Sequence, residues 1–213
     1  MKRGILAVMV STVLFLVAAP AFAAGGYVGL EGGAVWLPDL KISGPGGSGE
    51  LSTDTGYSIG AVGGYNFGTY RLEGEFSWRS NDNKEVSAFG LSAPAGGETT
   101  AWALMVNGYY DFRMVSPKVY PYLGAGIGGA SVSENLEDPT VGGQKVIDDD
   151  DFVFAYQFIA GIAFDVSKEF TMALDYRYFA TTDPSFEVIG TGGQKIDGEY
   201  SSHNVMLTLR YNF

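Results

Sequence analysis

Charged side chains recur at every second position in several stretches of this sequence, a spacing that can bring them together. The clearest stretch runs through Arg71, Glu73 and Glu75, and Asp175 and Arg177 repeat the pattern further on. Alternate residues of an extended strand point to the same face. Opposite charges on one enclosed face must pair, because a buried charge needs a partner. The sequence therefore predicts an internal network of arginines surrounded by carboxylates, made of Glu31, Arg71, Glu73, Glu75, Asp111, Asp165, Asp175, Arg177 and Arg210.

A second group of carboxylates forms an uninterrupted run, Asp148, Asp149, Asp150 and Asp151. Hard divalent cations such as Ca²⁺ favour carboxylate oxygens, so the run is compatible with a cation site or with a bridge through divalent ions to lipopolysaccharide. An acidic run in a connecting segment is more often simply solvated. We expect a solvated acidic loop and assign no metal ligand.

The single histidine, His203, is the remaining residue with catalytic potential. Glu199, Ser201 and His203 share one face of an extended segment, a grouping that hydrolytic enzymes use. The sequence shows no accompanying oxyanion donors, and it contains no cysteine for thiolate chemistry. We therefore expect no catalytic residue, no cofactor and no enzyme activity.

Alternation of apolar and polar residues predicts the strands that must position these side chains. It is clearest from Tyr70 to about Arg79, where Leu72, Phe76 and Trp78 share the apolar face. In the fifth segment, glycines 124, 126 and 128 share a face and leave room opposite for long charged side chains. Each segment reaches the roughly nine to eleven tilted residues that cross a bilayer. The eight segments are 26–37, 55–67, 70–79, 99–112, 119–133, 152–165, 170–181 and 201–213.

Composition excludes several classes of protein. The 213 residues carry a net charge of −11, which makes a nucleic-acid partner improbable. Hydrophobic residues make up 46% of the chain, yet no apolar run of membrane-helix length follows the N-terminus. Lys2 and Arg3 precede a short apolar run, and small residues flank Phe22, so we expect residues 1–23 to be a cleaved signal peptide rather than a retained inner-membrane anchor.

The connections between the segments predict how the strands are arranged. Links after the second, fourth and sixth segments are short, whereas the other links are long and rich in Gly, Ser, Asp and Glu. Short turns at one end and long loops at the other are typical of a transmembrane barrel, which must close because lipid offers no partners to a free sheet edge. A soluble lipocalin-like barrel is the alternative. Aromatic residues at the strand ends favour the membrane barrel, because they match two interfacial girdles.

The last strand shows a family resemblance. Leu209, Tyr211 and Phe213 lie on its apolar face and end the sequence on an aromatic residue. This ending is similar to the closing strand of bacterial outer-membrane barrels, in which the terminal Phe is the assembly signal. Residues 24–213 as a whole resemble the OmpA-like and opacity-type, porin-like outer-membrane proteins; the residues that carry the resemblance are 72–75, 107–112, 119–128 and 210–213.

The resemblance implies an all-β, eight-stranded, antiparallel, up-and-down transmembrane β-barrel in the cell outer membrane. Its implied partners are outer-membrane lipid, lipopolysaccharide and the barrel-assembly machinery, which reads the last strand. Family members differ in activity, so function must be argued from sites. We expect a structural or surface-interaction role, such as adhesion, through long acidic extracellular loops that contact an extracellular ligand. The alternatives are a narrow, low-conductance, cation-preferring channel, suggested by the excess of internal carboxylates, and more remotely a lipid A-modifying enzyme.

Overall fold

The computed structural model describes residues 25–38, 40–44, 47–88, 91–94, 96–113, 116, 118–138, 144–187, 195–198 and 200–213. The predicted signal peptide, residues 1–23, lies outside this described part. Within it, no helix has the length and apolar character needed to cross a membrane.

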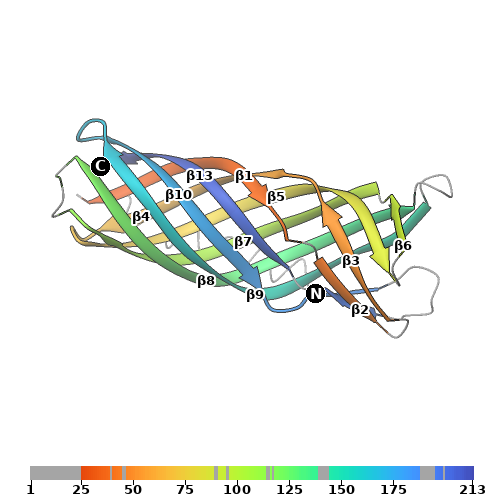
Figure 1. Cartoon of the computed structure of the whole chain (residues 1–213). Helices are drawn as coiled ribbons and strands as arrows, with labels where there is room; N and C mark the ends of the chain where they lie inside the picture. Colours follow the sequence, from red (N-terminus) through yellow and green to blue (C-terminus); the bar gives the residue numbers. More distant parts are fainter. Residues whose placement is uncertain are drawn as a thin grey trace.

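Eight antiparallel strands close into a barrel, as predicted (Figure 1). Each barrel strand pairs with the barrel strand that follows it in the chain, and the pairing of β1 with β13 closes the ring. The barrel strands are β1 (Gly26–Trp36), β4 (Gly56–Asn66), β5 (Tyr70–Ala88), β7 (Gly96–Asp111), β8 (Val119–Asp138), β9 (Gln144–Asp165), β10 (Phe170–Thr181) and β13 (Ser201–Asn212).

Five short strands extend the barrel wall at the end opposite the C-terminus (Figure 1). The sequence predicts loops in these regions, which are long connections rich in Gly, Ser, Asp and Glu. That assignment is wrong, since strands outside the bilayer need no apolar face and are held by pairing alone, as β3 is by β5. The added strands are β2 (Leu40–Gly44), β3 (Gly47–Thr53), β6 (Leu91–Pro94), β11 (Ser185–Glu187) and β12 (Lys195–Gly198).

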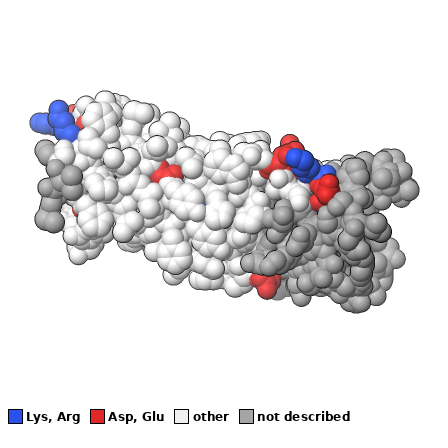
Figure 2. Space-filling model, viewed as in Figure 1, with Lys and Arg blue, Asp and Glu red and all other residues white. Residues whose placement is uncertain are grey.

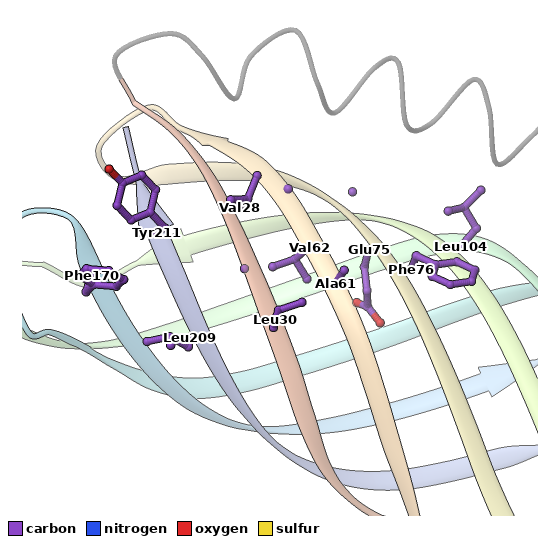
Figure 3. Close-up of a pocket in the computed structure, with 13 residues that line it drawn as sticks. Val28, Leu30, Ala61, Val62, Glu75, Phe76, Leu104, Phe170, Leu209 and Tyr211 are labelled. Carbon is purple, nitrogen blue, oxygen red and sulfur yellow. The ribbon is translucent and has the colours of Figure 1, made fainter.

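The two faces of the wall meet opposite environments. Leu30 is 72% exposed on the outside of β1, whereas its neighbour Glu31 is 6% exposed on the inside. Figure 3 shows apolar side chains such as Val28 and Leu209 on the outer surface. On the face shown in Figure 2, the outer surface of the middle region carries few charged side chains, and most of those that are visible lie toward the two ends. This distribution is what a lipid-facing wall around a polar interior requires.

Aromatic residues form a girdle near each end of the apolar band. At the outer end, the rings of Tyr57 and Trp78 lie 5.4 Å apart and those of Trp78 and Trp102 lie 5.7 Å apart. At the end that carries the C-terminus, Phe170 and Tyr211 make a similar contact at 5.3 Å. Amphipathic rings prefer the membrane interface, so the two girdles mark the limits of the spanning region.

The short turns lie at the end that carries the C-terminus. Between β4 and β5, Gly68 has φ of +99°, a conformation that favours glycine, and its N–H donates to Asn66 Oδ1 at 2.7 Å. Between β9 and β10, the Ser167 hydroxyl accepts hydrogen bonds from the N–H groups of Glu169 and Phe170. These tight connections fix the register of the paired strands at this end.

The barrel wall predicts a strong dependence of stability on depth. Leu174 is 50% exposed and lies opposite Ile162 and Leu207, midway between the girdles. Leu174→Arg should lower the free energy of unfolding by ~2–4 kcal/mol, because a lipid-facing arginine is most costly at the midplane. Ser131→Arg, opposite Trp102 at the outer girdle, is the matched control and should cost less than ~1 kcal/mol. Urea unfolding in lipid vesicles measures both, and equal losses would contradict the assigned membrane position.

Candidate functional site: the charged lumen

Arg177 of β10 lies at the centre of the barrel interior and is 2% exposed. Its Nη1 and Nη2 donate to the two carboxylate oxygens of Glu31 on β1, at 3.2 and 2.8 Å. Its Nη1 also donates to Glu75 of β5 at 3.1 Å, and its Nε donates to Asp175 of its own strand at 2.5 Å. The fork geometry of a guanidinium suits such paired contacts. One side chain therefore ties together three separated strands of the wall.

Glu75, fully buried, extends this arrangement to further strands. Asn107 of β7 and Gln157 of β9 donate to its Oε2 at 2.8 and 2.7 Å. Its Oε1 accepts from the Ser77 hydroxyl at 3.0 Å and lies 3.7 Å from Nη2 of Arg79. Because both carboxylate oxygens have partners, the burial of this charge is compensated.

A second cluster lies nearer the end that carries the C-terminus and the short turns, which is the periplasmic end of a transmembrane barrel. Arg71 Nε lies 3.0 Å from both carboxylate oxygens of Asp111, and the Arg71 guanidinium lies over the ring of Tyr109 at 4.2 Å. The hydroxyls of Tyr27 and Tyr109 donate to Glu73 at 2.8 and 2.7 Å. Tyrosine hydroxyls therefore donate hydrogen bonds to a buried carboxylate that accepts none from an arginine among the described residues.

Glycines in the wall make room for these long side chains. A Cβ at Gly60 would lie 2.8 Å from Glu31 Oε1, and one at Gly161 would lie 2.6 Å from the Tyr122 ring. Gly124 and Gly126 play the predicted part of leaving space, but for Tyr109 and Asn107 rather than for arginines. Glycines on one strand, which have no Cβ, thus lie beside bulky polar side chains of the next strand.

The middle of the lumen is filled. The cavity among Arg71, Glu73, Asp175 and Arg177 has a volume of about 10 Å³. A space of this size holds about one water molecule. Eight-stranded barrels enclose an interior just wide enough for side chains, and this interior follows that rule.

Not every residue predicted for the network belongs to the central cluster. Asp165 lies at the periplasmic rim, where Arg113 Nη1 donates to it at 3.1 Å. Among the described residues, Arg210 has no carboxylate partner, so the prediction that carboxylates surround it is wrong. The alternation correctly predicts that Arg210 points inward, but it does not identify the charged residues around it. The structure divides the remaining predicted residues between two clusters: Glu31, Glu75 and Asp175 contact Arg177, and Glu73 and Asp111 contact Arg71.

Two arginines outside the predicted network also contact its carboxylates, Arg79 inside the barrel and Arg113 at its rim. Arg79 is 1% exposed and contacts Ser77, Glu75 and the ring of Phe179. Arg113 contacts Asp165 and lies 3.8 Å over the ring of Tyr120. Arg79 continues the alternation of β5, so the pattern already contained its signal, whereas Arg113 lies in the turn after β7. With them included, arginines nearly match carboxylates inside the barrel, which weakens the inference of a cation-preferring excess.

The other predicted residues lie outside the lumen network. The acidic run lies within strand β9 rather than in a loop, so its carboxylates alternate between two faces and do not converge; Asp150 is exposed, and the side chain of Asp148 lies outside the described part. No group of three or more metal-ligating side chains occurs in the described residues.

His203 stacks on Tyr176, whose hydroxyl lies 2.5 Å from Nδ1, so the histidine belongs to the outer girdle. Glu199 lies outside the described residues.

The residues predicted to form the assembly signal lie on the outer surface of β13 and just after it. Leu209, Tyr211 and Phe213 are 50%, 41% and 46% exposed, and the rings of Tyr211 and Phe213 lie 5.2 Å apart. The Phe213 N–H donates to the Gly26 carbonyl, which joins the last residue to the first strand. These side chains face lipid at the periplasmic end.

Glu134 of β8 is a buried carboxyl beyond the outer girdle. It lies three positions past Ser131, which pairs with Trp102, and is therefore outside the spanning region. Asn83 and Thr99 donate to its two oxygens at 2.8 and 2.7 Å. Burial without a basic partner raises the pKa of Glu134 to about 7, despite these hydrogen bonds.

A closed barrel with an apolar exterior, two aromatic girdles and a charged interior defines an outer-membrane protein. The chain matches the family model of the outer membrane protein beta-barrel domain over residues 9–213, and it belongs to that family.

Known structures share the fold. Neisserial surface protein A is similar with a TM-score of 0.55 and 20% identity, over 89% of this chain and 98% of that one. The outer membrane protein OprG from Pseudomonas aeruginosa is similar with a TM-score of 0.63 and 14% identity, over 89% and 96%. An uncharacterized protein of Brucella abortus is 30% identical over 54% of this chain and 48% of that protein, so the match spans about half the length of this relative.

The tight packing of Gly60 against the network predicts a costly substitution. In Gly60→Ala the new methyl would meet Glu31 Oε1 and the Phe76 carbonyl oxygen, both at 2.8 Å. The free energy of unfolding should fall by ~1–3 kcal/mol, since overpacking strains the surrounding atoms. Gly32→Ala is the control, because its Cβ would come no closer than 3.6 Å to any neighbour. Urea unfolding measures the free energy of unfolding of both variants. Equal losses in the two would contradict the tight packing around Gly60.

The raised pKa of Glu134 predicts a pH-dependent outer end. A carboxyl whose folded pKa of about 7 exceeds the ordinary 4.5 contributes stability that is complete below pH 4.5 and is lost as the pH rises through 7. Amide protection factors at the outer ends of β5, β7 and β8 should therefore be lower at pH 8 than at pH 6. Glu134→Gln should remove the difference between the two pH values. A difference that persists in this variant would show that another titratable group causes it.

Proposed function

We propose that the protein is a surface-interaction protein whose barrel holds an extended platform above the outer membrane. The observation that carries this proposal is the length of the outer strands: β5, β8 and β9 run for 19, 20 and 22 residues. A spanning strand needs only about 9–11 residues. The additional length, together with the paired strands β2, β3, β11 and β12, supports a role at the cell surface rather than within the bilayer.

The charge of this platform favours a cationic partner. Among the side chains described at the outer end, carboxylates greatly outnumber the single lysine, Lys84, which lies 3.1 Å from Asp54. Complementary charge mainly provides steering and specificity. The partner class is therefore a basic protein segment, or lipopolysaccharide bridged through divalent cations. The exposed or partly exposed carboxylates are Asp54, Asp82, Glu85, Glu98, Asp149, Asp150, Asp151 and Asp183.

The alternatives have less support. A channel needs a passage, and the described lumen is packed with ion-paired side chains around a cavity of about 10 Å³. An enzyme needs a reactive side chain with a positioned partner, and His203 instead stacks between Tyr176 and Tyr178. We infer that the interior is structural and that the protein is not an enzyme.

The last strand supports a further part of the proposal. Leu209, Tyr211 and Phe213 form an apolar ridge on the lipid face, next to Phe170. We propose that the barrel-assembly machinery reads this ridge after the signal peptide, residues 1–23, is removed in the periplasm.

Neutralising the platform should abolish binding of a cationic probe. Purified barrel in zwitterionic nanodiscs should bind a fluorescent oligolysine peptide, and the affinity should fall with rising salt because exposed charges are screened. In Asp82→Asn/Asp150→Asn/Asp183→Asn the affinity should drop by about tenfold or more, equivalent to ~1.4 kcal/mol.

Lys168→Gln, at the opposite end of the barrel, serves as the control and should bind as the wild type does. Fluorescence titration measures all three forms. The proposal fails if oligoglutamate binds as tightly as oligolysine, or if the neutralised variant retains full affinity.

A further inference from the structure

The periplasmic end of the barrel contains a basic hollow that the proposed surface role does not use. Its volume is about 710 Å³, and it opens between the short turns and the ends of β1 and β13. Side chains that line it include five cations, Arg71, Arg113, Lys118, Lys168 and Arg210, and one carboxylate, Asp165. The basic lining contrasts with the net charge of −11 of the whole chain. We call this hollow the periplasmic vestibule.

Arg210 is the most unusual residue of the vestibule. It is 3% exposed, yet its Nε and Nη2 have no hydrogen-bond partner among the described residues. Its guanidinium carbon lies 5.5 Å from the ring centroid of Tyr27. A buried guanidinium without a counter-charge is costly, so a partner from outside the chain would stabilise it.

Arg71 contributes a second donor with no partner. Its Nε is held by Asp111 and its Nη1 lies near Glu73 and Tyr27, but Nη2 has no described partner. The guanidinium is therefore fixed in place, and Nη2 is a buried donor with no hydrogen-bond partner among the described residues. A fixed donor loses little entropy on binding, so it is well prepared to receive a ligand.

The carboxylates near the vestibule are already engaged. Asp111 lies between Arg71 and Arg113, at 3.0 and 3.8 Å. Asp165 accepts from Arg113, from Tyr120 at 3.2 Å and from the Thr171 hydroxyl at 2.7 Å. Neither acid is in contact with Arg210, so the positive charge of this residue remains uncompensated.

We propose that the periplasmic vestibule binds a small oxyanion, a phosphate or carboxylate group, through Arg210 and Nη2 of Arg71. Guanidinium groups recognise such anions by paired hydrogen bonds, and buried donors bind them more strongly than exposed ones. Lys118 and Lys168 at the rim draw the anion in. The Arg177 cluster closes the lumen above the vestibule, so the anion is held there and not conducted.

Inorganic phosphate is the probe that tests this site. Isothermal titration of the folded, full-length mature barrel in detergent should show saturable binding of one phosphate. Arg210→Gln should weaken it by about tenfold or more, which corresponds to ~1.4 kcal/mol. Lys84→Gln removes one positive charge at the opposite end of the barrel and should leave the affinity unchanged. Absence of saturable binding, or equal affinities of the wild type and Arg210→Gln, would overturn the proposal.

Two further measurements keep the test decisive. If Arg210→Gln does not give a folded, heat-modifiable barrel, Lys118→Gln/Lys168→Gln replaces it and should weaken phosphate binding about threefold by loss of rim charge. Nanodiscs with and without phosphatidylglycerol distinguish the source of the oxyanion. A free periplasmic anion predicts the same phosphate affinity in both, whereas a lipid headgroup predicts competition in the anionic discs. The oligolysine experiment probes the other end, so either proposal can fail alone.

Discussion

The structure depends on one constraint: a guanidinium buried inside the barrel must be neutralised, while the outer face of the barrel wall lies in lipid. Arg177 satisfies it with Glu31, Glu75 and Asp175, which come from three strands. A buried charge that loses one partner is strongly destabilising, so the contacts with Glu31 and Glu75 hold β1 and β5 to β10. The lumen therefore acts as the core of the barrel, in which ion pairs lie beside buried apolar side chains such as Met105, Val132 and Phe179.

The wall is built to make this core possible. Small residues on one strand face large polar residues on the next, as Gly161 faces Tyr122 and Gly60 faces Glu31. On the outside, lipid takes the place of a packed core and requires only an apolar surface with interfacial aromatic residues. Beyond the girdles neither requirement applies, and the strands continue with polar side chains on both faces. The same sheet thus serves as membrane anchor, rigid core and surface platform.

Much of this organisation can be predicted from sequence, for a physical reason. Two contrasting environments impose a strict period of two, which identified the barrel strands and the inward direction of Glu75 and Arg177. Where that contrast ends, the pattern ends too: the run that includes Asp150 was assigned to a loop, although pairing with β8 keeps it in a strand. Arg210 shows a second limit, because alternation gives the face of a side chain but not its partners. That Arg210 has no described carboxylate partner emerges only from the three-dimensional register.

A double-mutant cycle between Glu31 and Arg177 tests the central role of the buried ion pairs most directly. Urea unfolding in lipid vesicles should show that Arg177→Met alone costs ~3–5 kcal/mol. The coupling energy with Glu31→Gln should reach ~1–3 kcal/mol. The exposed pair of Lys84 and Asp54, with side chains 64% and 59% exposed, is the reference and should couple by less than ~1 kcal/mol. Coupling at Arg177 no larger than at Lys84 would contradict a barrel held together by its charged interior.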